Sequence, residues 1–130
     1  MKRCTVVLPV AAIEPSLPFW QALGFERTAT VPHEGAIGFV IFERGSVQVM
    51  LQSIPSIEVD HAPTAAALTG GPTLLFVEVS SLDEVRGPLE GAPVVMAERT
   101  TFYGTREIGV RTPGGHQVTF AEFLAPETPS

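Results

Sequence analysis

The sequence is poor in cysteine and in charged side chains. Its one cysteine, Cys4, excludes an intrachain disulfide. A chain without disulfides is typical of a reducing compartment, so we expect a cytoplasmic protein. Charged residues make up only 17%, and 14 acidic against 8 basic residues give a net charge of −6. Because a basic surface supplies most of the affinity for nucleic acid, we expect no nucleic-acid partner.

Long apolar runs are also missing. No stretch reaches the roughly 18 residues of a membrane-spanning helix, so we expect no membrane partner. Hydrophobic residues nevertheless make up 45% of the 130 residues, which indicates a globular chain. This length and composition predict a single domain over residues 1–130 with its own core.

The chain repeats itself with an offset of 69 residues. Apolar strand-like runs and later Gln-Val runs occupy equivalent positions in the two halves: Val10 with Val79, Ile13 with Leu82, and Val49 with Val118. A constant offset near both ends of each half indicates a duplicated module.

Each half predicts one βαβββ unit, that is, a strand, a helix and three further strands. Pro18 removes an amide donor near the start of the first helix, so its first turn is expected to be irregular. The first unit comprises a strand at 5–10, a helix at 14–25 and strands at 26–31, 36–43 and 47–52. The second comprises a strand at 74–79, a helix at 82–89 and strands at 94–100, 105–111 and 116–123.

The connecting segments are rich in Pro, Gly, Ala and Thr. Residues 54–72 show no clear period and are expected to form a linker, with at most one helical turn at 64–68. The order Thr112-Pro113-Gly114-Gly115 favours a type II turn. The tail, 126–130, is expected to fray.

Two segments carry a resemblance to a known superfamily. Residues 16–25, read S-L-P-F-W-Q-A-L-G-F, resemble the first helix of the glyoxalase/bleomycin-resistance/dioxygenase (vicinal oxygen chelate) superfamily. Residues 103–116, read Y-G-T-R-E-I-G-V-R-T-P-G-G-H, are similar to its Y-G-x-R-E-F-x-V-R-D-P-D-G-N motif. The resemblance implies an α+β fold of two modules (about 4–53 and 73–124) whose curved mixed sheets surround a concave pocket. It also implies a homodimer, with modules paired within one chain or exchanged between two.

The metal-dependent members of this superfamily place His, Glu or Gln at four points. Carried onto this chain, these points are Thr5, Met50, Leu74 and Thr119. Leucine has no donor atom, threonine is a poor neutral one and methionine prefers soft ions, so we expect no metal site and no cofactor. Three lone histidines, in turns or the linker and without a ligand spacing, are expected to be solvated: His33, His61 and His116.

The alternation of side chains along the 47–52 strand gives it two different faces. Val47, Val49 and Leu51 are apolar and are expected to pack on the helix, which leaves Gln48, Met50 and Gln52 for the pocket. A merely hydrated sheet face is the alternative. The same alternation selects Gln117 and Thr119 in the second half. Aromatic residues that could stack on or cap a ligand, and the segment with the Arg-Glu motif, supply the others. The full set of expected ligand-binding residues is Phe39, Gln48, Met50, Gln52, Phe102, Tyr103, Glu107, Arg111, Gln117 and Thr119.

Three functions remain open. The first is a metal-independent protein that sequesters a planar or cationic small molecule, like the bleomycin-resistance members, and is not an enzyme. The second is a lyase, isomerase or dioxygenase of the same superfamily with unusual metal ligands. The third is a metal-free enzyme in which Glu107 or Glu122 acts as a general base.

Overall fold

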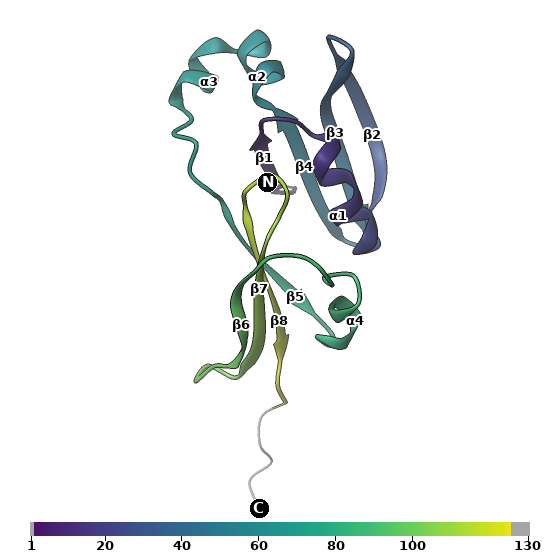
Figure 1. The fold of residues 1–130 in the computed structure, drawn as a ribbon, viewed down its shortest axis with the longest axis vertical. Coiled ribbons are helices and arrows are strands. Elements are labelled where there is room, and N and C mark those ends of the chain that lie inside the picture. Colours follow the sequence, from purple (N-terminus) through teal and green to yellow (C-terminus); the bar gives the residue numbers. More distant parts are fainter. Residues whose placement is uncertain (1, 126–130) are drawn as a thin grey trace, which may run out of the picture. The chain divides into compact units, whose positions relative to one another are not determined.

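The structure, a computed structural model, describes residues 2–125. It has the predicted α+β architecture, with one four-stranded mixed sheet in each half of the chain (Figure 1). The chain divides into two compact units. The first contains the described residues up to Pro72 together with Pro113–Gly115, and the second contains Thr73–Thr112 and the described residues from His116 onward.

The first unit contains the predicted βαβββ order. Its sheet has the order β1-β4-β3-β2, in which β1 runs parallel to β4 and the other neighbours are antiparallel. The elements are β1 (Val6–Val10), the 3-10 helix η1 (Glu14–Ser16), α1 (Leu17–Ala22), β2 (Glu26–His33), β3 (Ala36–Arg44) and β4 (Val47–Ser53).

The core of the first unit lies between this sheet and α1. Val40, Phe42 and Leu51 are at most 1% exposed and pack on the same side as Trp20, whose ring stacks on that of Phe42 at 6.4 Å. Val49 is buried as expected, but Val47, at the strand's start, is 38% exposed. The expectation for Val47 is wrong because it lies where β4 leaves the β3–β4 turn, opposite the exposed Arg44.

The helix begins irregularly, as predicted. A 3-10 turn precedes α1, and each of the two short helices carries a proline in its first two positions, where a missing amide donor breaks no helical hydrogen bond. Gly24 then adopts a φ of +87° just after the helix, a conformation that glycine adopts without strain.

The segment after the first sheet is more ordered than the sequence suggests. It forms two helices, α2 (Ile54–Asp60) and α3 (Ala62–Ala67). The amide of Ser56 donates to the Ser53 side chain at the start of α2, and the amide of Thr64 donates to His61 Nδ1 at the start of α3. Capping at both starts satisfies amides that have no helical partner, which explains two helices where the composition predicted a linker.

The second unit repeats the arrangement. Its sheet has the order β5-β8-β7-β6, again with one parallel pair, β5 with β8. Its helix is shorter than predicted, because Gly87 and Pro88 follow α4 directly. The elements are β5 (Leu74–Val79), α4 (Asp83–Arg86), β6 (Val94–Thr100), β7 (Thr105–Arg111) and β8 (Gln117–Phe123).

The β7–β8 turn differs from the predicted type II turn. Gly115, and not Gly114, has a positive φ, of +88°. This pattern is that of a turn followed by one left-handed residue, which is common in three-residue hairpin loops. Gly114 is required for another reason: a Cβ atom there would lie 2.6 Å from Val10 Cγ1 and 3.4 Å from Ser16 Oγ.

No helix of the described part of the chain is long and apolar enough to cross a membrane. The expected fraying of 126–130 lies outside the described residues.

Candidate functional site

The sheet of the first unit has one face that does not contribute to the core, and β4 supplies its centre. Gln48, Met50 and Gln52 are half-buried on this face, while Val49 and Leu51 on the opposite face are 2% and 1% exposed. The predicted division of this strand into a core face and a polar face is therefore confirmed for its central residues. We call the surface of Gln48, Met50, Gln52 and Phe39 the Gln–Met face.

Phe39 comes to this face from the neighbouring strand. It pairs with Gln52 across β3 and β4, and Ile41 pairs in the same way with Met50. Phe39 is half-buried, whereas Val40 beside it is completely buried on the helix side. The aromatic ring therefore belongs to the Gln–Met face and not to the core.

Hydrogen bonds hold one glutamine of the Gln–Met face from both sides. Thr5 Oγ1 donates to Gln48 Oε1 at 2.8 Å, and Gln48 Nε2 donates to Glu43 Oε1 at 2.6 Å. Among the described residues, Gln52 makes a side-chain hydrogen bond through its nitrogen alone, which donates to Ser56 Oγ at 3.3 Å. The Gln52 carbonyl oxygen and the Met50 thioether therefore have no hydrogen-bond partner among the described residues.

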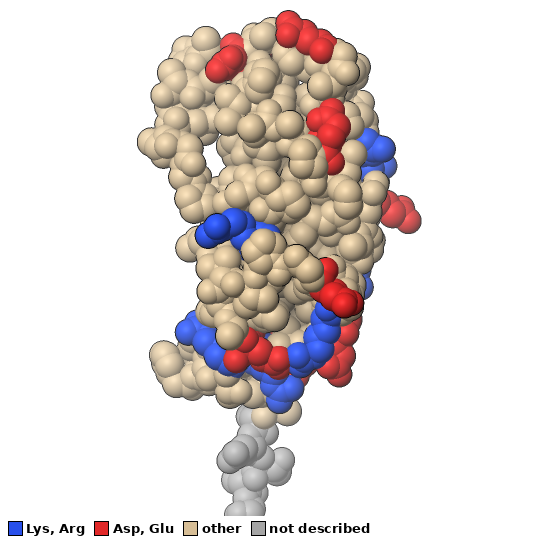
Figure 2. All heavy atoms as spheres, viewed as in Figure 1, with Lys and Arg blue, Asp and Glu red and all other residues tan. Residues whose placement is uncertain are grey.

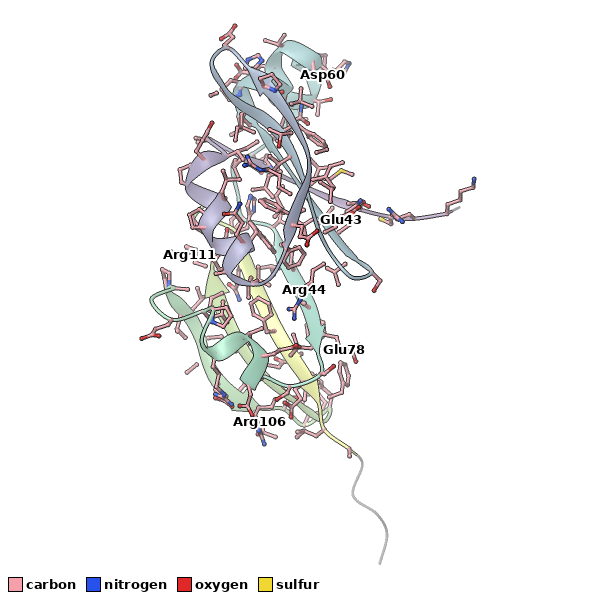
Figure 3. The ribbon with its side chains drawn as sticks, turned by 90° about the vertical axis from the view of Figure 1, so that its right-hand side faces the viewer. Glu43, Arg44, Asp60, Glu78, Arg106 and Arg111 are labelled. Atoms are coloured by element: carbon pink, nitrogen blue, oxygen red, sulfur yellow. The ribbon has the colours of Figure 1, made fainter. Side chains whose placement is uncertain are left out.

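In the second unit, four of the expected residues share one face of the sheet. Arg111 pairs with Gln117, Gly109 with Thr119, and Glu107 with Ala121. Residues opposite one another in adjacent strands point to the same side, so Gln117, Thr119, Glu107 and Arg111 lie on one face. Figure 3 shows Arg106 and Arg111 at opposite ends of β7.

Glu107 is the most enclosed charged side chain of this face, at 1% exposure. One carboxylate oxygen, Oε2, accepts hydrogen bonds from Tyr103 Oη at 2.7 Å and from Thr105 Oγ1 at 2.8 Å. The other, Oε1, accepts from Arg99 Nη2 at 3.2 Å. Three donors from the β6–β7 hairpin therefore surround one carboxylate.

Burial of Glu107 opposes its ionisation and is the largest single influence on its pKa. The hydrogen bonds from Tyr103, Thr105 and Arg99, with the charge of Arg99, together outweigh burial and hold the pKa below its usual value. A carboxylate stabilised in this way is a weak base. Glu122, the other base considered, accepts the Leu82 amide at 2.9 Å.

The adjacent residues Arg106 and Glu107 do not form an ion pair with each other. Glu107 is buried and pairs with Arg99, while Arg106 Nε lies 3.9 Å from Glu98 Oε1. Side chains of adjacent residues in a strand point to opposite faces, which separates Arg106 from Glu107. The cross-strand partner Arg99 was not identified from the sequence because bulges in β6 shift its register.

The two aromatic residues of the hairpin differ in their surroundings. Phe102 is completely exposed, and its ring meets that of Tyr103 edge-on at 5.2 Å. Tyr103 is half exposed, with its hydroxyl bound to Glu107. Phe102 as a cap over a ligand stays a prediction.

The four superfamily metal positions carry side chains that do not fit a divalent ion. In the parallel strand pairs, Met50 lies opposite Val7, and Thr119 opposite Phe76, so the adjacent residues supply no donor either. Across the described residues there is no group of three or more His, Cys, Asp or Glu placed to hold a metal ion. Metal-dependent chemistry of the superfamily therefore lacks its ligand set at these positions.

The histidines do not all behave as expected. His116 is 5% exposed, and its Nδ1 accepts the Thr73 amide at 2.9 Å, which ties the start of β5 to the residue before β8. The prediction that His116 is a solvated turn residue is therefore wrong. Its ring is buried and serves as the hydrogen-bond acceptor for the backbone amide of Thr73. His33 has an exposed fraction of 19% and lines a small pocket of 190 Å³ in the first unit.

A second pocket, of 270 Å³, lies next to the Gln–Met face and was not anticipated from the residue pattern. Val7, Pro9 and Gln52 form its sheet side. Residues of α2 and α3 and of their caps form the other: Ile57, Asp60, His61, Thr64 and Leu68. The His61 cap of α3 was the available signal, but histidine is an uncommon cap and the helices themselves were not predicted.

Comparison with known proteins reveals similarity only at the level of structure. No family model matches the sequence, and no curated protein matches it. A glyoxalase/bleomycin resistance protein/dioxygenase from Nocardioides is 23% identical with a TM-score of 0.72, covering 100% of this chain and 90% of its own. A lactoylglutathione lyase from Agrobacterium tumefaciens is 18% identical with a TM-score of 0.73, covering 92% of each chain.

A bleomycin resistance determinant encoded on the transposon Tn5 is also similar. It is 15% identical with a TM-score of 0.69, and the match covers 96% of this chain and 100% of that protein. These similarities show that the chain has the glyoxalase/bleomycin-resistance/dioxygenase fold, as the sequence resemblance predicted. Because a lyase and a resistance protein share this fold, the fold alone does not determine the function.

Proposed function

We propose that the protein binds a small organic molecule on its Gln–Met face without a metal ion and acts by sequestering it. The observation that carries this proposal is the chemistry of the four superfamily metal positions. A thioether, an aliphatic side chain and two hydroxyls stand there, and their cross-strand neighbours include Val7 and Phe76. A sequestering protein requires only a pocket with a few placed polar groups, and no reaction step.

The ligand class follows from the side chains of the face. Phe39 offers a flat apolar surface for a planar ring, Met50 offers an adaptable thioether, and the Gln52 carbonyl offers a hydrogen-bond acceptor. The net charge of −6 favours a cation over an anion. We therefore expect a planar or cationic molecule. Bleomycin is the first to test, because the structurally similar Tn5 protein is a bleomycin resistance determinant.

A homodimer in the cytoplasm belongs to the same proposal. Large apolar side chains of the second sheet remain exposed, including Leu74 at 72%, Phe76 at 56% and Phe123 at 54%. Apolar clusters of this kind mark interaction surfaces. Light scattering coupled to size-exclusion chromatography is expected to give twice the 13.9 kDa chain mass.

The enzymatic alternatives receive no comparable support. A general base works best when its pKa lies near the working pH. The pKa of Glu107 is held below its usual value, further from neutral pH, and both of its oxygens accept hydrogen bonds. Both features make Glu107 a poorer general base.

Metal analysis of the purified protein tests the first part of the proposal. After dialysis, mass spectrometry is expected to find Zn, Mn, Ni and Fe each well below one ion per chain. A stoichiometric ion that survives dialysis contradicts metal independence.

A thermal-shift screen tests ligand binding. Bleomycin-type antibiotics, other planar aromatic cations and small thiol conjugates are the probes, because a ligand that binds only the folded state raises the melting temperature. For any compound that raises it, Phe39→Ala and Gln52→Ala are expected to weaken binding. Thr30→Ala is the matched control, since Thr30 is exposed on β2 and pairs with Val40 of the helix side. Equal loss in all three variants would place the site elsewhere.

A further inference from the structure

The pocket between α2–α3 and the first sheet has apolar walls on two sides. Val7 and Pro9 of β1 line one side, and Ile57 of α2 with Leu68 at the end of α3 line the other. Its volume of 270 Å³ lies near the lower limit of small-molecule sites, which start at about 300 Å³. The walls therefore suit a compact apolar body, of the size of one aromatic ring with a short side chain.

Four polar side chains line the same pocket: Gln52, Asp60, His61 and Thr64. Asp60 is exposed, and its carboxylate makes no ion pair or hydrogen bond with any described residue. Gln52 uses its nitrogen for Ser56, which leaves its carbonyl oxygen as an acceptor. His61 Nδ1 accepts the Thr64 amide at 3.2 Å and lies 2.7 Å from Thr64 Oγ1, so this ring nitrogen is engaged at the start of α3.

The charge around the pocket is of one sign. No Lys or Arg lines it, and the sequence contains neither residue between Arg44 and Arg86. Over α2 the face of the molecule in Figure 2 shows red acidic atoms and no blue basic ones. Figure 3 shows Asp60 at the end of α2, where a carboxylate without a partner attracts a cation.

We propose that this pocket binds a small organic ammonium ion. The ammonium group donates to the Asp60 carboxylate and to the Gln52 carbonyl oxygen, and the apolar body lies between Val7 and Ile57. The site shares Gln52 with the Gln–Met face but goes beyond the proposed function, because β1, α2 and α3 supply its other residues and Asp60 supplies a charge that the Gln–Met face does not have. A primary amine on a single aromatic ring is the class that matches both volume and charge.

Nuclear magnetic resonance titration of the full chain with benzylamine tests the proposal. Benzyl alcohol and benzoate, the neutral and anionic probes of the same shape, serve as comparisons. Benzylamine is expected to shift the amide signals of α2, α3 and β1 with saturation. Benzyl alcohol is expected to bind more weakly, and benzoate not to bind.

Asp60→Asn removes the charge and keeps the shape. Because Asp60 is exposed and water screens its charge, affinity for benzylamine is expected to fall about two- to fivefold. Glu58→Gln is the matched control: it removes the same charge from the same helix, but Glu58 is exposed and does not line the pocket. Leu68→Trp fills the cavity and is expected to abolish binding of benzylamine.

Two results would overturn the proposal: benzoate binding as tightly as benzylamine, or equal affinities of Asp60→Asn and Glu58→Gln. Phe39→Ala keeps this test separate from the proposed function, since Phe39 does not line the pocket. Benzylamine affinity is expected to be unchanged in that variant, whatever the ligand screen of the Gln–Met face shows.

Discussion

Replacement of Glu107 by glutamine measures how much one enclosed carboxylate stabilises the second unit. Glutamine keeps the shape and one carbonyl oxygen but places an NH₂ group against the Tyr103 hydroxyl and Thr105 hydroxyl or against Arg99. Hydrogen bonds to a charged group contribute about 1.5–3 kcal/mol each and are not additive. Arg99 and Tyr103 are themselves half exposed, so water reduces the effect, and we expect a loss of about 1–3 kcal/mol at neutral pH.

The pH dependence gives an independent test of the same reasoning. The pKa of Glu107 in the folded protein lies below its ordinary value of 4.5, so its ionised form stabilises the fold. This contribution is fully present above about pH 4.5 and is lost as the pH falls through the folded pKa. The difference between the wild type and Glu107→Gln is therefore expected to shrink on acidification from pH 4.5.

Urea unfolding followed by circular dichroism at pH 7 and at several lower pH values is the assay. Tryptophan fluorescence does not suffice, because the only tryptophan, Trp20, lies in the first unit. Glu98→Gln is the control: Glu98 also binds an arginine, Arg86 at 2.6 and 2.8 Å, but on the surface, where its loss is expected to matter less. The reasoning fails if Glu107→Gln is as stable as the wild type at pH 7 or if the difference grows with acidification.

Two further substitutions test the β7–β8 turn and the residues beneath it. Gly114→Ala is expected to destabilise the protein by about 1–3 kcal/mol, since the new Cβ would lie 2.6 Å from Cγ1 of the buried, β-branched Val10; Gly115→Asn, at a φ of +88° with open space around it, is the comparison expected to cost less. Ser16→Ala is expected to be neutral or to stabilise by about 1 kcal/mol, because the Ser16 hydroxyl is buried and makes no hydrogen bond in the described structure. Urea unfolding by tryptophan fluorescence measures both, and a clear loss of stability in Ser16→Ala would reveal a partner for that hydroxyl.

The sequence predicted the parts of the fold that depend on simple periodicity. Alternation along 47–52 separated Gln48 and Met50 from Val49 and Leu51, and the structure has the same separation. The offset of 69 residues predicted two modules with the same order of elements, and the structure has two sheets of equivalent strand order. These features follow from the two-residue period of a strand, which leaves no choice once one face is buried.

The features that the sequence did not predict depend on contacts between distant residues or on irregular strands. Helices α2 and α3 have seven and six residues and begin at capping side chains. Helices this short are too brief to show an amphipathic period in the sequence. The partner of Glu107 depends on the bulged register of β6, which places Arg99, and not the adjacent Arg106, beside the carboxylate. The type of the β7–β8 turn depends on whether Gly114 or Gly115 adopts the positive φ. Both residues are glycine, so the sequence does not distinguish between the two possibilities.

The two modules use equivalent positions of their sheets in different ways. Phe39 pairs with Gln52 in the first, and Glu107 pairs with Ala121, the residue 69 positions after Gln52, in the second. The first position is half-buried and apolar, and the second is a carboxylate closed off by three donors. A closed hydrogen-bond network holds its hairpin rigid, whereas an open aromatic and a thioether can adapt to a ligand. Under the proposed function, the first module supplies the adaptable ligand-binding surface, and the enclosed carboxylate of Glu107 stabilises the second module.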